Sequence, residues 1–177
     1  MSRRIPRAGN KSTAPPPVLA GFRVIEFAVV KRPISFSGRS DLIVGGLNGE
    51  SKEIGPVPRL AIGQSLRRKR EFALLHCTRT WDVLGVQGAY ETVAQVKRRA
   101  ERTYTRVSEA WVATNVTIGE AKQFERIVWH RLKCSFCGRI PPQQDAPDLA
   151  TVVSSKKANI CGKCIYEFYD AITSHDA

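Results

Sequence analysis

Two short stretches near the C-terminus decide the fold there: Cys134-Ser135-Phe136-Cys137-Gly138 and Cys161-Gly162-Lys163-Cys164. Two residues between the cysteines of a pair allow one turn to direct both sulfurs at a single ion, and two such pairs complete a tetrahedral shell. Zinc accepts four thiolates without redox chemistry, and a shell filled by sulfur has no open position for water or substrate. The spacing therefore predicts one structural zinc ion with four ligands: Cys134, Cys137, Cys161 and Cys164.

Paired cysteines have other uses, which the sequence leaves open: two disulfides, a redox-active CxxC pair, or an iron–sulfur cluster. Disulfides require an oxidising compartment, and no feature of the sequence indicates one. Gly138 and Gly162 are expected to permit sharp turns beside the sulfurs. His130, four residues before Cys134, is surplus beside four thiolates, and we expect it on a helix surface.

The C-terminal part of the chain combines four features: the two cysteine pairs, a spacer that carries Leu149, the run Asn159–Ile165 and an apolar stretch ending at Ile172. Together they resemble the four-cysteine zinc-binding domain of the ClpX unfoldase. The resemblance covers residues 134–172 only. It implies a small treble-clef-like zinc module that dimerises and binds adaptor proteins and unfolded substrates. The spacer is longer than the family's usual one and holds several prolines, and the module lies at the C-terminal end of the chain instead of the N-terminal end.

The apolar residues of this module predict its contact surface. Ile165, Phe168, Tyr169 and Ile172 have the spacing of one helix face, which should pack partly on the zinc core. The rest of this face is expected either to receive a second copy or a peptide, or to pack on the helix Thr117–Leu132 of the same chain. The resemblance adds Phe136 and Leu149, so the predicted protein-binding or dimer surface comprises Phe136, Leu149, Ile165, Phe168, Tyr169 and Ile172.

Composition and length define the remaining organisation. A chain of 177 residues with 42% hydrophobic content can hold one ordinary domain and a metal-dependent module. We expect an α+β fold in three parts: a disordered basic arm at 1–17, a basic strand-containing and helical domain at 18–133, and the zinc module at 134–177. No family resemblance is seen for residues 1–133.

Several function classes are disfavoured. No segment approaches the ~18 continuous apolar residues that cross a bilayer, and the N-terminus lacks a signal peptide's apolar run, so we expect a soluble cytoplasmic protein without a membrane partner. The Gly-rich segment 45–52 lacks the Gly-Lys-Ser/Thr ending of a phosphate-binding loop and is better interpreted as a hairpin turn at Asn48-Gly49. Cys77, beside His76, is expected to be a small buried residue. No catalytic constellation is evident, so we expect no enzyme activity and no ATPase.

The net charge of +12 lies entirely upstream of the module, because residues 134–177 contain four basic and five acidic residues. Such a charge attracts polyanions, of which nucleic acid is the leading one.

Strands are expected at Val18–Val30 and Asp41–Gly45, and helices at Gln64–Leu75, Tyr90–Val112 and from Thr117, where Thr117 and Glu120 form a capping box. The expected core stripe of the second helix is Val93, Val96, Ala100, Tyr104, Val107 and Trp111. The candidate phosphate contacts are Arg67, Arg68, Lys69, Arg70, Lys97, Arg98, Arg99, Arg102 and Arg106.

Two hypotheses follow. The preferred one is a non-enzymatic interaction protein whose ClpX-like zinc module mediates homodimerisation or binds a protein partner. The alternative is a nucleic-acid-binding protein that uses the basic helices of residues 64–112 and a structural zinc ion.

Overall fold

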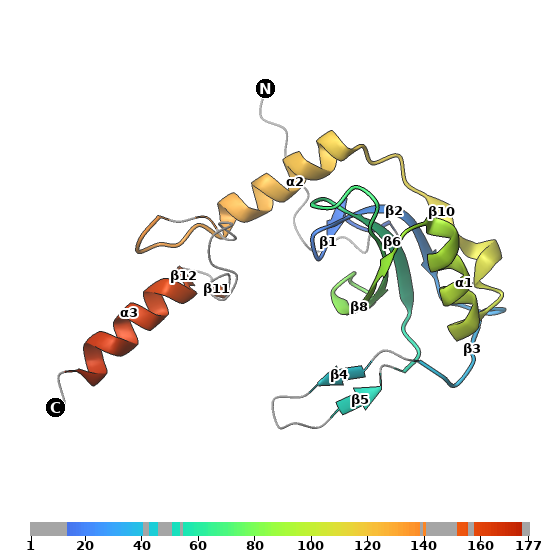
Figure 1. Ribbon diagram of the computed structural model, residues 1–177, viewed down its shortest axis with the longest axis horizontal. Coiled ribbons are helices and arrows are strands. Elements are labelled where there is room, and N and C mark those ends of the chain that lie inside the picture. The colour runs from blue at the N-terminus through green and yellow to red at the C-terminus, as the bar shows by residue number, and fades with distance from the viewer. Residues whose placement is uncertain are drawn as a thin grey trace. The chain divides into compact units, whose positions relative to one another are not determined.

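The computed structural model describes residues 14–40, 43–45, 51–53, 55–138, 140, 152–155 and 158–174 (Figure 1). Helices and strands are mixed, and a cysteine cluster lies near the C-terminus, which confirms the predicted α+β class. The chain forms two compact units, Met1–Lys122 and Gln123–Ala177. The division falls inside helix α2, Ile118–Arg131.

The first unit is built on an antiparallel sheet with the strand order β1-β2-β6-β7-β8, and β10 also pairs with β2. Smaller two-stranded pairs join β3 to β9 and β4 to β5. The strands of the first unit are β1 Val18–Leu19, β2 Phe22–Val29, β3 Ser35–Phe36, β4 Ile43–Gly45, β5 Ser51–Glu53, β6 Arg59–Ser65, β7 Phe72–Cys77, β8 Val83–Tyr90, β9 Tyr104–Thr105 and β10 Val112–Ala113.

The predicted strand Val18–Val30 is in fact a hairpin of β1 and β2. Ala20 and Gly21 both have positive φ, 48° and 78°, and connect the paired residues Leu19 and Phe22. A two-residue turn with both φ values positive matches the twist of the strands that it joins. Of the predicted strand Asp41–Gly45, the structure shows β4 (Ile43–Gly45) paired with β5; Asp41 and the expected turn at Asn48-Gly49 lie outside the described residues.

The predicted helix Gln64–Leu75 is wrong. This segment is the end of β6, a hairpin tip at 66–71 and the start of β7, with Gln64 paired to Phe72 and Ile62 to Leu74. Ala73, Leu74 and Leu75 are all fully buried, because the strand is central and both of its faces are covered. A strand buried on both faces shows no alternation of apolar and polar residues, so its pattern cannot be told from that of a buried helix.

The predicted helix Tyr90–Val112 is helical only over α1, Val93–Thr103, where Thr92 forms a capping box with Gln95. At Tyr104 the backbone becomes extended, Arg106 has φ 65°, and a short 3₁₀ turn at Val107–Ala110 precedes β10. The β-branched and aromatic run Thr103-Tyr104-Thr105 favours extended backbone, which explains the early end of the helix.

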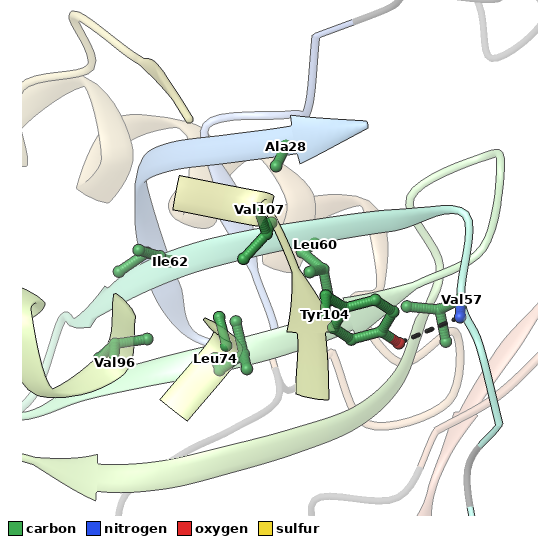
Figure 2. Close-up of a cluster of buried hydrophobic side chains, with 9 residues drawn as sticks. Ala28, Val57, Leu60, Ile62, Leu74, Val96, Tyr104 and Val107 are labelled. Atoms are coloured by element: carbon green, nitrogen blue, oxygen red, sulfur yellow. Dashed lines mark hydrogen bonds between the residues drawn. The ribbon is translucent and has the colours of Figure 1, made fainter. Parts of the chain in front are cut away.

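The apolar stripe predicted for this segment does face the core, although only its first part is helical. Val96 and Ala100 of α1, together with Tyr104 and Val107, are fully buried against one face of the sheet (Figure 2). The hydroxyl of Tyr104 accepts a hydrogen bond from the Val57 N–H at 3.1 Å. The sheet residues in this cluster are Ala28, Leu60, Ile62 and Leu74. Val93 and Trp111 pack at its margin.

The opposite face of the sheet has its own buried cluster: Leu19, Val24, Ala61, Ala73, Leu75, Cys77 and Trp81. The Trp81 ring meets Phe27 edge-on at 5.6 Å between centroids, and the Arg59 guanidinium lies 4.8 Å from the same ring. Because alternate residues of β6 and β7 enter opposite clusters, the sheet is covered on both faces.

The predicted start of α2 is confirmed. The Glu120 N–H donates to Thr117 Oγ1 at 3.2 Å, and the Thr117 N–H donates to Glu120 Oε2 at 2.9 Å. These reciprocal bonds satisfy two amides that the first helical turn leaves free. Among the apolar residues of α2, Ala121 is buried, whereas Ile127 and Val128 are exposed.

Candidate metal centre

The first cysteine pair directly follows α2. The helix ends at Arg131, and Cys134 to Cys137 form a turn that is closed by a 3.0 Å hydrogen bond from the Gly138 N–H to the Cys134 carbonyl. Gly138 has φ 72°, a conformation that glycine adopts without strain. The predicted role of Gly138 in a sharp turn is therefore confirmed.

The second cysteine pair lies at the junction of a hairpin and a helix. Strands β11 (Val152–Ser154) and β12 (Asn159–Cys161) pair antiparallel, and α3 (Gly162–Thr173) follows at once. Cys161 therefore ends a strand, while Cys164 lies in the first turn of α3. Gly162 is the first residue of this helix instead of a turn residue. The cysteine cluster is thus built from a turn, a hairpin and a helix, in this order.

The four cysteines converge on one point. Their sulfur atoms all lie within 4.8 Å of one another, with 3.8 Å between Cys134 Sγ and Cys164 Sγ and 3.6 Å between Cys137 Sγ and Cys161 Sγ. A tetrahedral ion with metal–sulfur bonds of about 2.3 Å separates its sulfurs by about 3.8 Å, whereas a disulfide requires about 2.05 Å. None of these four cysteines forms a disulfide. The cluster is thus positioned to hold one metal ion.

The environment of the sulfurs favours a bound cation. Main-chain N–H groups, that of Cys137 first and then that of Cys161, lower the pKa of Cys134 to about 6. Burial, and after it the neighbouring sulfurs, raises the pKa of Cys164 to about 12. Burial and the neighbouring sulfurs therefore resist a negative charge at Cys164. A divalent cation removes this resistance, since it neutralises the thiolates that it binds.

Asn159 is a structural residue of this centre to which sequence reasoning gave no role. Its side-chain amide donates to the carbonyls of Arg131 and Lys133, at 2.9 and 3.4 Å, and so joins the second pair to the last turn of α2. Its backbone exchanges hydrogen bonds with Ser135, whose N–H donates to the Asn159 carbonyl at 2.8 Å. The position of Asn159 two residues before Cys161 is the only signal in the sequence. These bonds attach the end of α2 to the strand that carries Cys161.

The predicted contact residues lie on the outside of this centre. Phe136 and Phe168 meet edge-on at 5.2 Å between ring centroids, which brings the first cysteine turn against α3. They are nonetheless 57% and 46% exposed, and Tyr169 and Ile172 are 64% and 69% exposed. Ile165 is exposed to a lesser degree. Leu149 lies outside the described residues, so its place in this surface stays a prediction.

The candidate phosphate contacts fall into two groups within the first unit. Arg67, Arg68, Lys69 and Arg70 are consecutive exposed residues at the β6–β7 hairpin tip, which is not the predicted helix. The second group lies on and after α1. In it Lys97 forms an ion pair with Glu26 at 2.7 Å, and Arg99 donates to the Gln87 amide oxygen at 2.9 and 3.1 Å when that amide is oriented to accept. The exposed members of the second group are Arg98, Arg102 and Arg106.

The remaining residues singled out by sequence do not belong to the four-cysteine cluster. Cys77 is fully buried, and burial raises the pKa of its thiol to about 12, so it is a poor nucleophile at neutral pH. His130 is exposed on α2 and does not belong to the cysteine cluster. In the part of the chain that the structure describes, no helix has the length and apolarity to cross a membrane.

No family model, no curated protein and no solved structure matches this chain. The four-cysteine cluster is therefore the most specific functional feature that its geometry supports.

Proposed function

We propose that this protein is a non-enzymatic interaction protein in which a structural zinc ion shapes a ClpX-like protein-binding module at residues 134–177. Zinc is favoured by the chemistry of the donor set, because four sulfurs at tetrahedral separations suit an ion that needs no redox chemistry and no particular ligand field. The ligands would be Cys134, Cys137, Cys161 and Cys164. With all four positions filled by sulfur, the ion has no place for substrate, so its role is to hold the fold.

The observation that carries the proposal is the apolar surface beside the metal centre. Phe168, Tyr169 and Ile172 each remain about half or more exposed on α3, and Phe136 joins them from the first cysteine turn. Large aromatic side chains that stay exposed in a cluster are typical of interfaces, where tyrosine and phenylalanine are enriched. Residues 134–177 also have almost no net charge, which suits an apolar contact better than a polyanion.

The proposed occupant of this surface is a second copy of the chain, as the ClpX resemblance implies. When a helix face packs on the same face of a second copy about a two-fold axis, the exposed side chains of both copies are buried in one interface. An adaptor protein or an unfolded segment would then bind a surface formed by both copies. This proposal rests on the exposed residues of α3 and on the resemblance together.

The test is native mass spectrometry of the full chain, before and after a strong chelator. We expect one zinc ion per chain and a dimer that dissociates when the metal is removed. The double substitution Tyr169→Ser and Ile172→Ser should give a monomer that keeps its zinc. Leu84→Ser is the matched control, because Leu84 is similarly exposed in the first unit and should leave the dimer intact. A zinc-loaded wild-type monomer would rule out self-association.

A further inference from the structure

The β6–β7 hairpin tip concentrates positive charge in a way that the fold does not require. Its residues 67–70 are three arginines and a lysine, all exposed, within a connection of six residues between Ser65 and Phe72. Arg68 forms an ion pair with Glu71 at 3.6 Å, but its side chain is 79% exposed, so this contact contributes little. Four neighbouring cations repel one another, and therefore the run lowers the stability of the free protein.

The tip is nevertheless held in a defined conformation by main-chain and polar contacts. The hydroxyl of Ser65 accepts hydrogen bonds from the N–H groups of Arg67 and Arg68, at 3.3 and 3.1 Å. The amide of Gln64 donates to the Lys69 carbonyl at 3.0 Å.

Further bonds anchor the base of the tip. Arg23 donates to the Gln64 amide oxygen at 2.6 Å, and the Leu66 N–H donates to the Gly21 carbonyl at 3.2 Å. All these bonds to the tip involve its backbone and leave its four cationic side chains facing solvent. The tip is thus pre-organised, which reduces the entropy lost when it binds a ligand.

The chemistry of the tip selects among anionic partners. Protein interfaces have an apolar centre, and binding to a membrane surface is strengthened by inserted apolar side chains. The four exposed residues of the tip are all cationic, and the neighbouring Leu66 is half-buried. Single-stranded nucleic acid is bound largely by aromatic stacking, and the tip has no aromatic residue. Phosphate backbones, in contrast, are bound by arginine and lysine alone, with arginine able to make two parallel hydrogen bonds to one phosphate.

We propose that the β6–β7 hairpin tip, Arg67 to Arg70, is a contact site for the phosphate backbone of a nucleic-acid duplex. The contact is independent of base sequence, since the tip carries no group suited to a single base. The basic residues of α1 contribute less, because Lys97 and Arg99 are engaged with Glu26 and Gln87. The proposal concerns the first unit and does not depend on the zinc module.

The test is fluorescence anisotropy of the full, zinc-loaded chain with labelled DNA and RNA duplexes of about 20 base pairs and the same sequence, from about 50 to about 200 mM salt. The variant Arg67→Ala/Arg70→Ala removes two tip charges and keeps the backbone hydrogen bonds. The control Arg98→Ala/Arg102→Ala removes two exposed charges from α1 and changes the net charge equally. Unchanged thermal unfolding shows that both variants are folded.

We expect the tip variant to bind about tenfold more weakly at moderate salt and the slope of log affinity against log salt to become shallower by about two. The control should lose less than about threefold. Similar affinities for the DNA and RNA duplexes support backbone recognition. A preference for one of them identifies the kind of duplex that the tip binds. Equal losses in both variants would show an effect of net charge instead of a site and overturn the proposal. It would also be overturned by absence of duplex binding at low salt, or by tighter, tip-dependent binding to anionic phospholipid vesicles.

Discussion

The two units of this chain have interiors of different chemistry. The first unit buries large apolar side chains on both faces of its sheet, among them Leu60, Ile62 and Leu74. In the second unit, the buried residues that the structure describes are three cysteines, with Ile160 packed partly against them. A cluster of this size is too small to offset the entropy of ordering the unit, whereas binding of a metal ion can offset it. The comparison predicts that this chain combines a fold stabilised by apolar burial with one that depends on a bound metal ion, and that different perturbations should separate the two.

The largest effect is expected from Cys134→Ser or Cys161→Ser. Either change removes a metal ligand, and the apparent free energy of zinc binding to such sites, about 10–16 kcal/mol, is also the folding energy of the module. Hydrogen–deuterium exchange should show residues 158–174 losing protection while the sheet of the first unit keeps it. Chelation of the wild-type protein should have the same effect.

The matched control for this experiment is Cys77→Ala, which removes the one thiol outside the cluster. Cys77 is fully buried in the first unit, so this variant should weaken the sheet and leave metal binding intact. Full protection of residues 158–174 without metal would contradict the assignment of a metal-dependent unit.

A decrease in pH is expected to have an intermediate effect, which is a lower stability of the first unit. His76 is 1% exposed and neither ring nitrogen has a hydrogen-bond partner; burial, and then the charge of Arg99, lowers its pKa from 6.5 to about 4. Between these values the unfolded chain binds a proton that the folded chain refuses. The free energy of unfolding therefore falls as the pH decreases from about 6.5 to about 4, by about 3 kcal/mol in all.

Urea denaturation at several pH values, followed by signals of the first unit, measures this effect. His76→Leu should flatten the dependence between pH 6.5 and 5, where carboxylates contribute least. An identical pH dependence in the wild type and in His76→Leu would show that His76 is not its source.

The smallest effect concerns α2, the helix that the division between the units crosses. Thr117→Ala removes the N-cap hydroxyl and should cost about 1 kcal/mol of helix stability, measured as faster amide exchange in the first turn. Glu120→Gln is the control, because an amide can still accept the hydrogen bond from the Thr117 N–H. Equal exchange in Thr117→Ala and in the wild type would mean that packing, and not the cap, sets the start of α2.

Features that depend on a few neighbouring residues could be predicted from the sequence. The spacing within each cysteine pair, the turn at Gly138 and the capping box at Thr117 follow from local geometry. The stripe from Val93 to Trp111 was also predicted as a core face. The contact surface was predicted in part: Phe136 and the α3 residues are exposed around the metal centre, while Leu149 stays untested.

Other features depend on distant partners. Gln64–Leu75 became a hairpin because β7 is enclosed by β6 and β8 and covered on both faces, which no window of this segment reveals. Asn159 acquired its role from carbonyls more than 20 residues away.

What the sequence by itself determined is therefore the four-cysteine cluster and the α+β class, since both follow from residue type and short spacing. What only the tertiary structure decided is which apolar runs are strands and which charges are free. Those properties depend on burial between elements and on side-chain pairing across the sheet, and neither is encoded in any local stretch of the chain.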